Sequence, residues 1–115
     1  MSIKTSNNFE IDNELLRNYF RNLVNLFFKI LPIRENEEDT LVTYMKSLQA
    51  ELMGCKTLVT AINNDSNFLT LISILQYLID NPQSSVMEVK REVFKAISIC
   101  NKLQSKYIVV RNEDD

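Results

Sequence analysis

The sequence contains no histidine and no tryptophan, and only one glycine and two prolines among its 115 residues. Without histidine the chain has no imidazole for acid–base or nucleophilic catalysis and no histidine ligand for a metal ion. A single glycine excludes a glycine-rich phosphate-binding loop and a collagen-like chain. We therefore expect a protein that is not an enzyme and that has no cofactor, metal site or small-molecule substrate.

Cysteine is also scarce. Cys55 and Cys100 are too few for a disulfide scaffold, and both fall at apolar helical positions, which predicts reduced, buried thiols. Residues 1–10 are polar and lack the hydrophobic core of a secretion signal, and the longest uncharged apolar stretch has 14 residues, short of the ~20 that span a bilayer. We expect a cytoplasmic protein without a membrane partner. Thirteen asparagines favour an AT-rich genome and thus a small bacterial or phage protein.

The apolar residues that are present follow a helical period. They predict an all-α fold, a four-helix bundle whose helices cover residues 12–31, 36–62, 66–80 and 86–107. Asp12 and Asn36 are candidate N-caps, Pro32 is expected to stop the first helix, and Ser85 and Glu88 form a capping-box pattern. Short loops make neighbouring helices antiparallel. The expected organisation is a flexible N-terminal segment (1–11), a single bundle domain (12–107) and an acidic C-terminal tail (108–115).

Two helices carry apolar residues at alternating steps of three and four, the spacing of a heptad seam. The seam of the second helix consists of Leu41, Met45, Leu48, Leu52, Cys55, Val59 and Ile62. The seam of the fourth consists of Val86, Val89, Val93, Ala96, Cys100, Leu103 and Tyr107. Two such seams indicate left-handed packing around a common core.

The first helix has a wider apolar surface. Its apolar residues, among them Phe20, Phe27 and Phe28, cover an arc of roughly 220°, whereas an amphipathic helix needs about 100°. The third helix has no charge before Asp80. Either these helices lie centrally in the bundle, or a second copy or another protein covers the excess apolar surface. We favour a homo-oligomer or a protein partner, with the three phenylalanines as interface residues.

The second helix has a stripe of small residues opposite its seam. The members of this small stripe are Thr43, Ser47, Ala50, Gly54, Thr57 and Ala61. Gly54 costs a helix about 1 kcal/mol relative to alanine, and small residues allow close approach of another backbone. The stripe therefore predicts a helix–helix contact, within the chain or with a second chain. The alternative is a solvated face, although such a face usually carries lysine and glutamate.

The fourth helix has a basic stripe, formed by Arg91, Lys95, Lys102 and Lys106. The stripe is either a solvated face or a docking face for an acidic partner or a nucleic-acid backbone. No aromatic residue interrupts it, which disfavours stacking on single-stranded bases. The chain as a whole has a net charge of −2.

The acidic residues suggest no catalytic pair. Glu35, Glu37, Glu38 and Asp39 cluster at a loop and the start of the second predicted helix, where carboxylates are stabilised by the positive end of the helix dipole. Glu51 falls at the edge of the second helix's seam and is expected to pair with a lysine or arginine of another helix. The sequence thus favours a non-enzymatic helical interaction module, such as an adaptor, assembly subunit or inhibitor. The alternative is a small nucleic-acid-associated subunit that uses the basic stripe.

Overall fold

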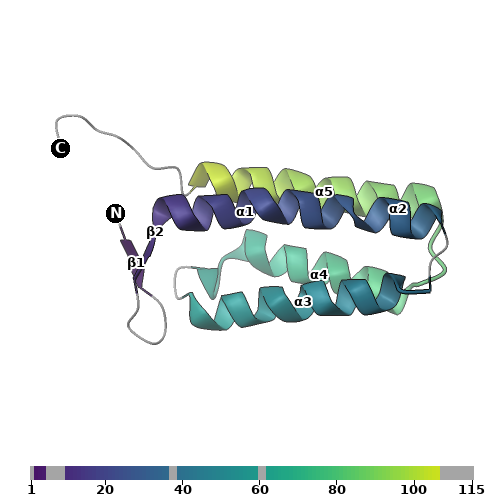
Figure 1. Cartoon of the computed structure of the whole chain (residues 1–115), viewed down its shortest axis with the longest axis horizontal. Coiled ribbons are helices and arrows are strands. Elements are labelled where there is room, and N and C mark those ends of the chain that lie inside the picture. Colours follow the sequence, from purple (N-terminus) through teal and green to yellow (C-terminus); the bar gives the residue numbers. More distant parts are fainter. Residues whose placement is uncertain (1, 5–9, 37–38, 60–61, 107–115) are drawn as a thin grey trace.

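The helices arrange into a bundle two layers deep (Figure 1). The computed structural model describes residues 2–4, 10–36, 39–59 and 62–106. Within them lie α1 (Asn13–Phe28), α2 (Ile30–Glu35), α3 (Leu41–Leu58), α4 (Ser66–Asp80) and α5 (Val86–Lys106). The short α2 prolongs α1, so that α1 and α2 together form one side of a four-helix bundle, as the sequence predicts.

We call the pair α1 and α2 the α1–α2 rod, and it runs antiparallel to its neighbours, as α3, α4 and α5 do to theirs (Figure 1). The α1–α2 rod packs along α5 in one layer, and α3 packs along α4 in the other (Figure 1). α4 and α5 hold the layers together closely, whereas α1 and α3 approach each other less closely than these pairs do. This difference leaves a surface groove between α1 and α3, with a cavity at one end of it.

Helical structure does not end at residue 31 before Pro32, contrary to the sequence prediction. Pro32 is the third residue of α2, where a helix leaves its amides without intrahelical partners. The ring of a proline at this position clashes with the carbonyl of the residue four before it, which is Phe28, so α1 ends there. Lys29 separates α1 from α2, and the proline therefore divides one predicted helix into two.

The second predicted helix is shorter than expected at both ends. Asn36 follows α2 as its C-cap instead of starting α3, and α3 begins after Thr40. At the other end Val59 adopts an extended conformation (φ −105°, ψ 104°). The Asn63 side chain donates a hydrogen bond to the Lys56 carbonyl at 3.1 Å. This carbonyl is one of those at the end of a helix that have no hydrogen-bond donor within the helix.

The predicted bounds of α4 are confirmed, and so is the predicted start of α5, whose predicted end at residue 107 lies outside the described residues. The Asp65 carboxylate caps α4 by accepting from the amides of Asn67 (2.8 Å) and Phe68 (3.1 Å). The Ser85 hydroxyl accepts from the Glu88 amide at 3.1 Å, which is half of the predicted capping box. The Glu88 side chain instead accepts from Tyr77 of α4.

Both predicted seams face the core. In α3 all the seam positions are buried except Cys55, which is half-buried, and Val59 and Ile62 remain buried beyond the end of the helix. In α5 the positions from Val89 to Leu103 are buried, whereas Val86 is exposed and Tyr107 lies outside the described residues. Phe20 of α1 and Phe68 of α4 meet edge to face, with ring centroids 6.2 Å apart, in this common core.

Two short strands precede the bundle, where the sequence predicts no regular structure. β1 (Ser2–Lys4) pairs antiparallel with β2 (Glu10–Asp12), and Ile3 lies opposite Ile11. The β-prone run 107–110 lies outside the described residues. No helix in the described part of the chain is both long enough and apolar enough to cross a bilayer.

Candidate interaction surfaces

Two of the three phenylalanines expected at an interface belong to the core. Phe20 and Phe27 are fully buried inside the chain, so they offer no surface to a partner. α5 packs closely along α1 and covers part of the wide apolar arc, and α4 likewise buries Phe68 and four aliphatic residues. Phe28 is 40% exposed and remains available to a partner.

The small stripe of α3 is exposed. Thr43, Ser47, Ala50, Gly54 and Thr57 all face solvent, and Ala61 lies outside the described residues. No other part of the described chain lies within 4 Å of the position that a β-carbon would take at Gly54. For the described residues the prediction of a close helix contact within the chain is therefore wrong, because α3 turns its opposite face to the core. Contact with a second chain stays a prediction.

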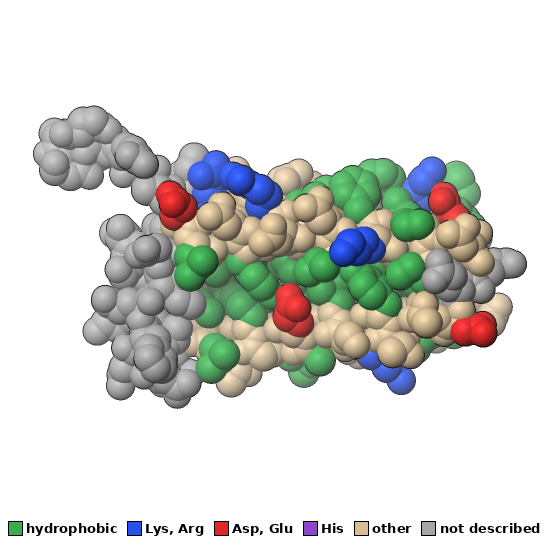
Figure 2. Space-filling model, viewed as in Figure 1, with side chains coloured by type: hydrophobic (Ala, Val, Ile, Leu, Met, Phe, Trp, Pro, Cys, Tyr) green, Lys and Arg blue, Asp and Glu red, His purple; other side chains and the backbone are tan. Residues whose placement is uncertain are grey.

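The groove between α1 and α3 is lined by apolar side chains. Figure 2 shows hydrophobic side chains along the middle of this face, between α1 above and α3 below. Tyr44 of α3 crosses the groove and donates to the Leu26 carbonyl of α1 at 2.7 Å. Tyr19 of α1 crosses in the other direction and donates to Glu51 of α3 at 3.3 Å. The two tyrosines thus join helices whose backbones lie farther apart than those of the other neighbours.

A cavity of about 300 Å³ opens at the end of this groove where α1 begins. Leu15, Leu16 and Tyr19 of α1 line it together with Cys55 and Val59. Its walls are largely apolar, and its volume is at the lower end of the range of ligand pockets. Because Leu15 is also exposed beside it, the cavity can admit an apolar side chain from another molecule.

Glu51, Tyr19 and Cys55 form a small polar cluster beside this cavity. The expected lysine or arginine partner of Glu51 is not found among the described residues, and its hydrogen-bond donor is Tyr19. Burial, followed by the nearness of Cys55 and Glu51, raises the pKa of Tyr19. Burial also raises the pKa of the Cys55 thiol, although a hydrogen bond with Tyr19 opposes this effect. A raised pKa disfavours the thiolate, so nothing here activates Cys55 as a nucleophile.

Cys100 lies in the core of the bundle. It is fully buried, and burial raises the pKa of its thiol to about 12. Both cysteines are free thiols, as predicted, but Cys55 is only half-buried. The two therefore differ in access to solvent.

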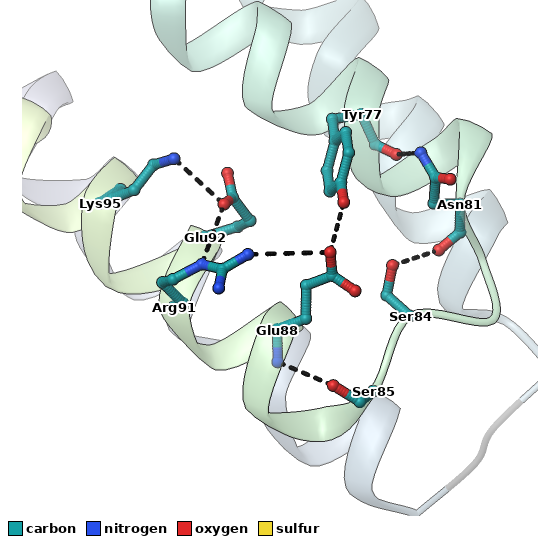
Figure 3. A network of polar contacts seen from close by, with 8 residues as sticks. All are labelled: Tyr77, Asn81, Ser84, Ser85, Glu88, Arg91, Glu92 and Lys95. Atoms are coloured by element: carbon teal, nitrogen blue, oxygen red, sulfur yellow. Dashed lines mark hydrogen bonds and ion pairs between the residues drawn. The ribbon is translucent and has the colours of Figure 1, made fainter.

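The structure neutralises much of the basic stripe (Figure 3). Arg91 lies 3.7 Å from Glu88 and 3.6 Å from Glu92, and Lys95 lies 3.0 Å from the same Glu92 oxygen. Tyr77 of α4 donates to Glu88, so this network also connects the two helices. Its charges are balanced locally, which leaves little excess positive charge for a nucleic-acid backbone.

Lys106, the last member of the basic stripe, pairs with Asp65 at the start of α4. Lys102 is exposed and has no ion pair to a described residue. Three of the four basic side chains are thus committed to carboxylates of their own chain. The arrangement favours a structural role for the stripe over the nucleic-acid contact that the sequence left open.

The acidic cluster before α3 forms no metal site in the part that the structure describes. Glu35 and Asp39 are exposed, whereas Glu37 and Glu38 lie outside the described residues. Across the described ranges, no three histidine, cysteine, aspartate or glutamate side chains gather as a metal site requires.

No protein-family model matches the chain, and no characterised protein and no solved structure matches it either. The groove between α1 and α3 could not be derived from the sequence, because its width depends on how two distant helices are placed. Tyr19 and Tyr44 at the edges of apolar stripes were the available signal, since a half-buried tyrosine needs an acceptor for its hydroxyl.

Proposed function

We propose that this protein is a non-enzymatic helical interaction module that binds another protein chain through the outward face of α3. The observation that carries the proposal is the exposed small stripe, which runs from Thr43 to Thr57 with Gly54 open at its centre. A solvated helix face gains helix stability from lysine, glutamate or alanine, so a glycine there is unfavourable unless the space above it is used.

The surroundings of the stripe support the same function. Met53 and Leu58 flank it on α3 and are about half exposed. Glu51 precedes Leu58 by two turns and is also exposed, so it can accept a lysine or arginine from a partner helix on the small stripe. Apolar side chains bordered by a polar rim are typical of protein interfaces.

The first test measures self-association. Sedimentation equilibrium of the wild-type chain at micromolar concentration is compared with Gly54→Leu and with Ser73→Leu, which places the same side chain on an exposed position of α4. If two copies associate through the stripe, Gly54→Leu separates them into folded single chains, and Ser73→Leu does not.

The second test covers a partner that is another protein. A photo-crosslinking amino acid is placed at Ala50 or at Ser73, and the protein is produced in the cells from which it comes. The proposal predicts a protein adduct that forms from position 50 and is lost in the Gly54→Leu background. A monomeric chain with the same adducts, or none, at both positions would contradict the proposal.

A further inference from the structure

A second surface lies in the other layer, where α1 packs against α5. Phe28 of α1 and Phe94 of α5 meet edge to face, with ring centroids 5.9 Å apart and ring planes at 83°. The two side chains are 40% and 47% exposed, and Met87, two turns before Phe94, is 79% exposed. We call Phe28, Phe94 and Met87 the Phe28–Phe94 patch. Half-exposed aromatic rings in contact are a typical anchor point for a partner.

Basic side chains lie on both sides of this patch. Lys90 precedes Phe94 by one helical turn, which is about 6 Å along the axis, and Arg21 precedes Phe28 by two turns, about 10 Å. Because α1 and α5 run antiparallel and the two rings are in contact, Lys90 and Arg21 lie in opposite directions from the rings (Figure 1). Both are exposed, and neither has an ion pair to a described residue.

The wider layer is also positive. In this layer α1, α2 and α5 together carry eight basic and four acidic residues, a net charge of +4, although Lys106 is paired with Asp65 of α4. Of the four carboxylates, Glu88 and Glu92 are held in the network with Arg91 and Lys95. The other two, Glu14 and Glu35, lie fourteen residues before and seven residues after Phe28, about 21 and 10 Å along the rod. The field near the patch therefore favours an anionic partner.

We infer that the Phe28–Phe94 patch binds an acidic amphipathic segment of a partner protein. An apolar side chain of that segment packs on the two rings, and carboxylates on either side of it pair with Lys90 and Arg21. Distances of about 6 and 10 Å correspond to four and seven residues on a helix, and both spacings return to the same helical face. A helix with acidic residues four before and seven after an apolar anchor matches the patch.

The chemistry of the patch favours a protein over a nucleic acid. The rings of Phe28 and Phe94 cover each other edge to face, so they present no pair of parallel ring surfaces on which successive bases could stack. Aromatic residues, methionine and arginine are instead enriched in protein interfaces, and Phe28, Phe94, Met87 and Arg21 are of these types. This inference concerns a surface other than α3 and does not depend on the function proposed for α3.

The test selects binders without assuming the partner. A displayed library of random 16-residue peptides is selected against the full chain, and the enriched peptides are then synthesised and titrated against the wild type, Lys90→Glu, Phe94→Ser and Lys46→Glu. Lys46 is exposed on α3, so its reversal changes the net charge as Lys90→Glu does, but on the other layer. We expect net-negative peptides with a large apolar residue, at least tenfold weaker binding to Lys90→Glu and Phe94→Ser, and unchanged binding to Lys46→Glu.

The same titration contains the outcomes that overturn the inference. Enriched peptides of neutral or positive charge would do so, and so would equal losses of affinity in Lys90→Glu and Lys46→Glu. A 15-nucleotide oligothymidine or vesicles of anionic lipid that bind more tightly than every selected peptide, with loss of binding in Lys90→Glu, would assign the patch to another kind of partner. Melting curves check that each variant is folded. If Gly54→Leu binds the selected peptides as the wild type does, the peptides bind outside the small stripe, and this inference is tested independently of the function proposed for α3.

Discussion

Lys106, the last residue of α5, donates a hydrogen bond to the carboxylate of Asp65, the residue that caps the start of α4. The two residues are 41 positions apart in the sequence. Burial alone would raise the pKa of Asp65, but the hydrogen bonds from Lys106 and from the amides of Phe68 and Asn67 outweigh burial and lower it. One carboxylate therefore holds together the beginning of one helix and the end of another.

The first prediction separates the two roles of Asp65. Asp65→Asn retains a side-chain oxygen that can cap α4 but loses the charge, and we expect a loss of stability of up to about 1 kcal/mol, because Lys106 is half exposed and water screens the pair. Asp65→Ala loses the cap as well and should cost about 0.5–2 kcal/mol more. Urea denaturation at neutral pH measures both values.

The same residue predicts a dependence on pH. The pKa of Asp65 is lower in the folded chain than in the unfolded chain, where it is about 3.9. Its contribution to stability is therefore complete above that value and is lost as the pH falls through the folded pKa. The difference in unfolding free energy between wild type and Asp65→Asn should shrink as the pH falls below about 4. A difference that stays constant down to pH 2 would contradict this account.

The second prediction concerns the two thiols. Cys55 is half-buried beside an open cavity, whereas Cys100 is fully buried and has a pKa of about 12. Under native conditions a thiol reagent should modify Cys55 first, because Cys100 can react only when the bundle opens. For a domain of ordinary stability this protection is on the order of a thousandfold or more.

The comparison uses single-cysteine variants, Cys55→Ser and Cys100→Ser, followed by mass spectrometry at intervals after mixing. In denaturant both thiols should react at similar rates. Faster native labelling of Cys100 than of Cys55 would show that α5 is not packed as described.

The third prediction uses neighbouring phenylalanines at the end of α1. Phe27 is fully buried and Phe28 is 40% exposed, so the same substitution tests which of them belongs to the core. Phe27→Ala should destabilise the chain by about 3–5 kcal/mol, because it leaves a cavity in the bundle. Phe28→Ala loses a ring contact with Phe94 and part of its buried area, and should cost about 1 kcal/mol. Equal losses in thermal unfolding would mean that both residues are core residues.

The period of the apolar residues is enough to predict most of this core. Met45, Leu52, Val93 and Leu103 are buried where the heptad spacing places them, since each helix can bury only the face along which its apolar residues recur. The start of α4 at Ser66 is also predicted correctly, although Asp65, which caps it, is not among the caps that the sequence predicts.

Other features depend on information that a local pattern does not contain. Whether Pro32 ends one helix or begins another depends on the residues that follow it, and here they continue as α2. The pairing of Tyr19 with Glu51 requires the rotation of α1 relative to α3, two helices that are distant in the sequence. The contact of Phe28 with Phe94, 66 positions apart, arises in the same way, so the surface proposed for an acidic partner was not visible in the sequence.

The last prediction concerns Gly54 in the isolated chain. Because a β-carbon there would have nothing of the described chain within 4 Å, Gly54→Ala introduces no clash and restricts the unfolded chain. We expect the single chain to gain about 1 kcal/mol, the difference in helix propensity between glycine and alanine. Chemical denaturation at a concentration where the chain is monomeric measures this gain, with Ala50→Gly, one turn earlier on the same stripe, as the reverse substitution. Ala50→Gly should lose a similar amount.

A destabilising Gly54→Ala in the monomer would mean that part of the same chain covers the stripe, and the proposed binding face would then not exist. A stabilised monomer that assembles or binds less well would instead show that glycine is kept at this position for contact with another chain, at the expense of the stability of α3.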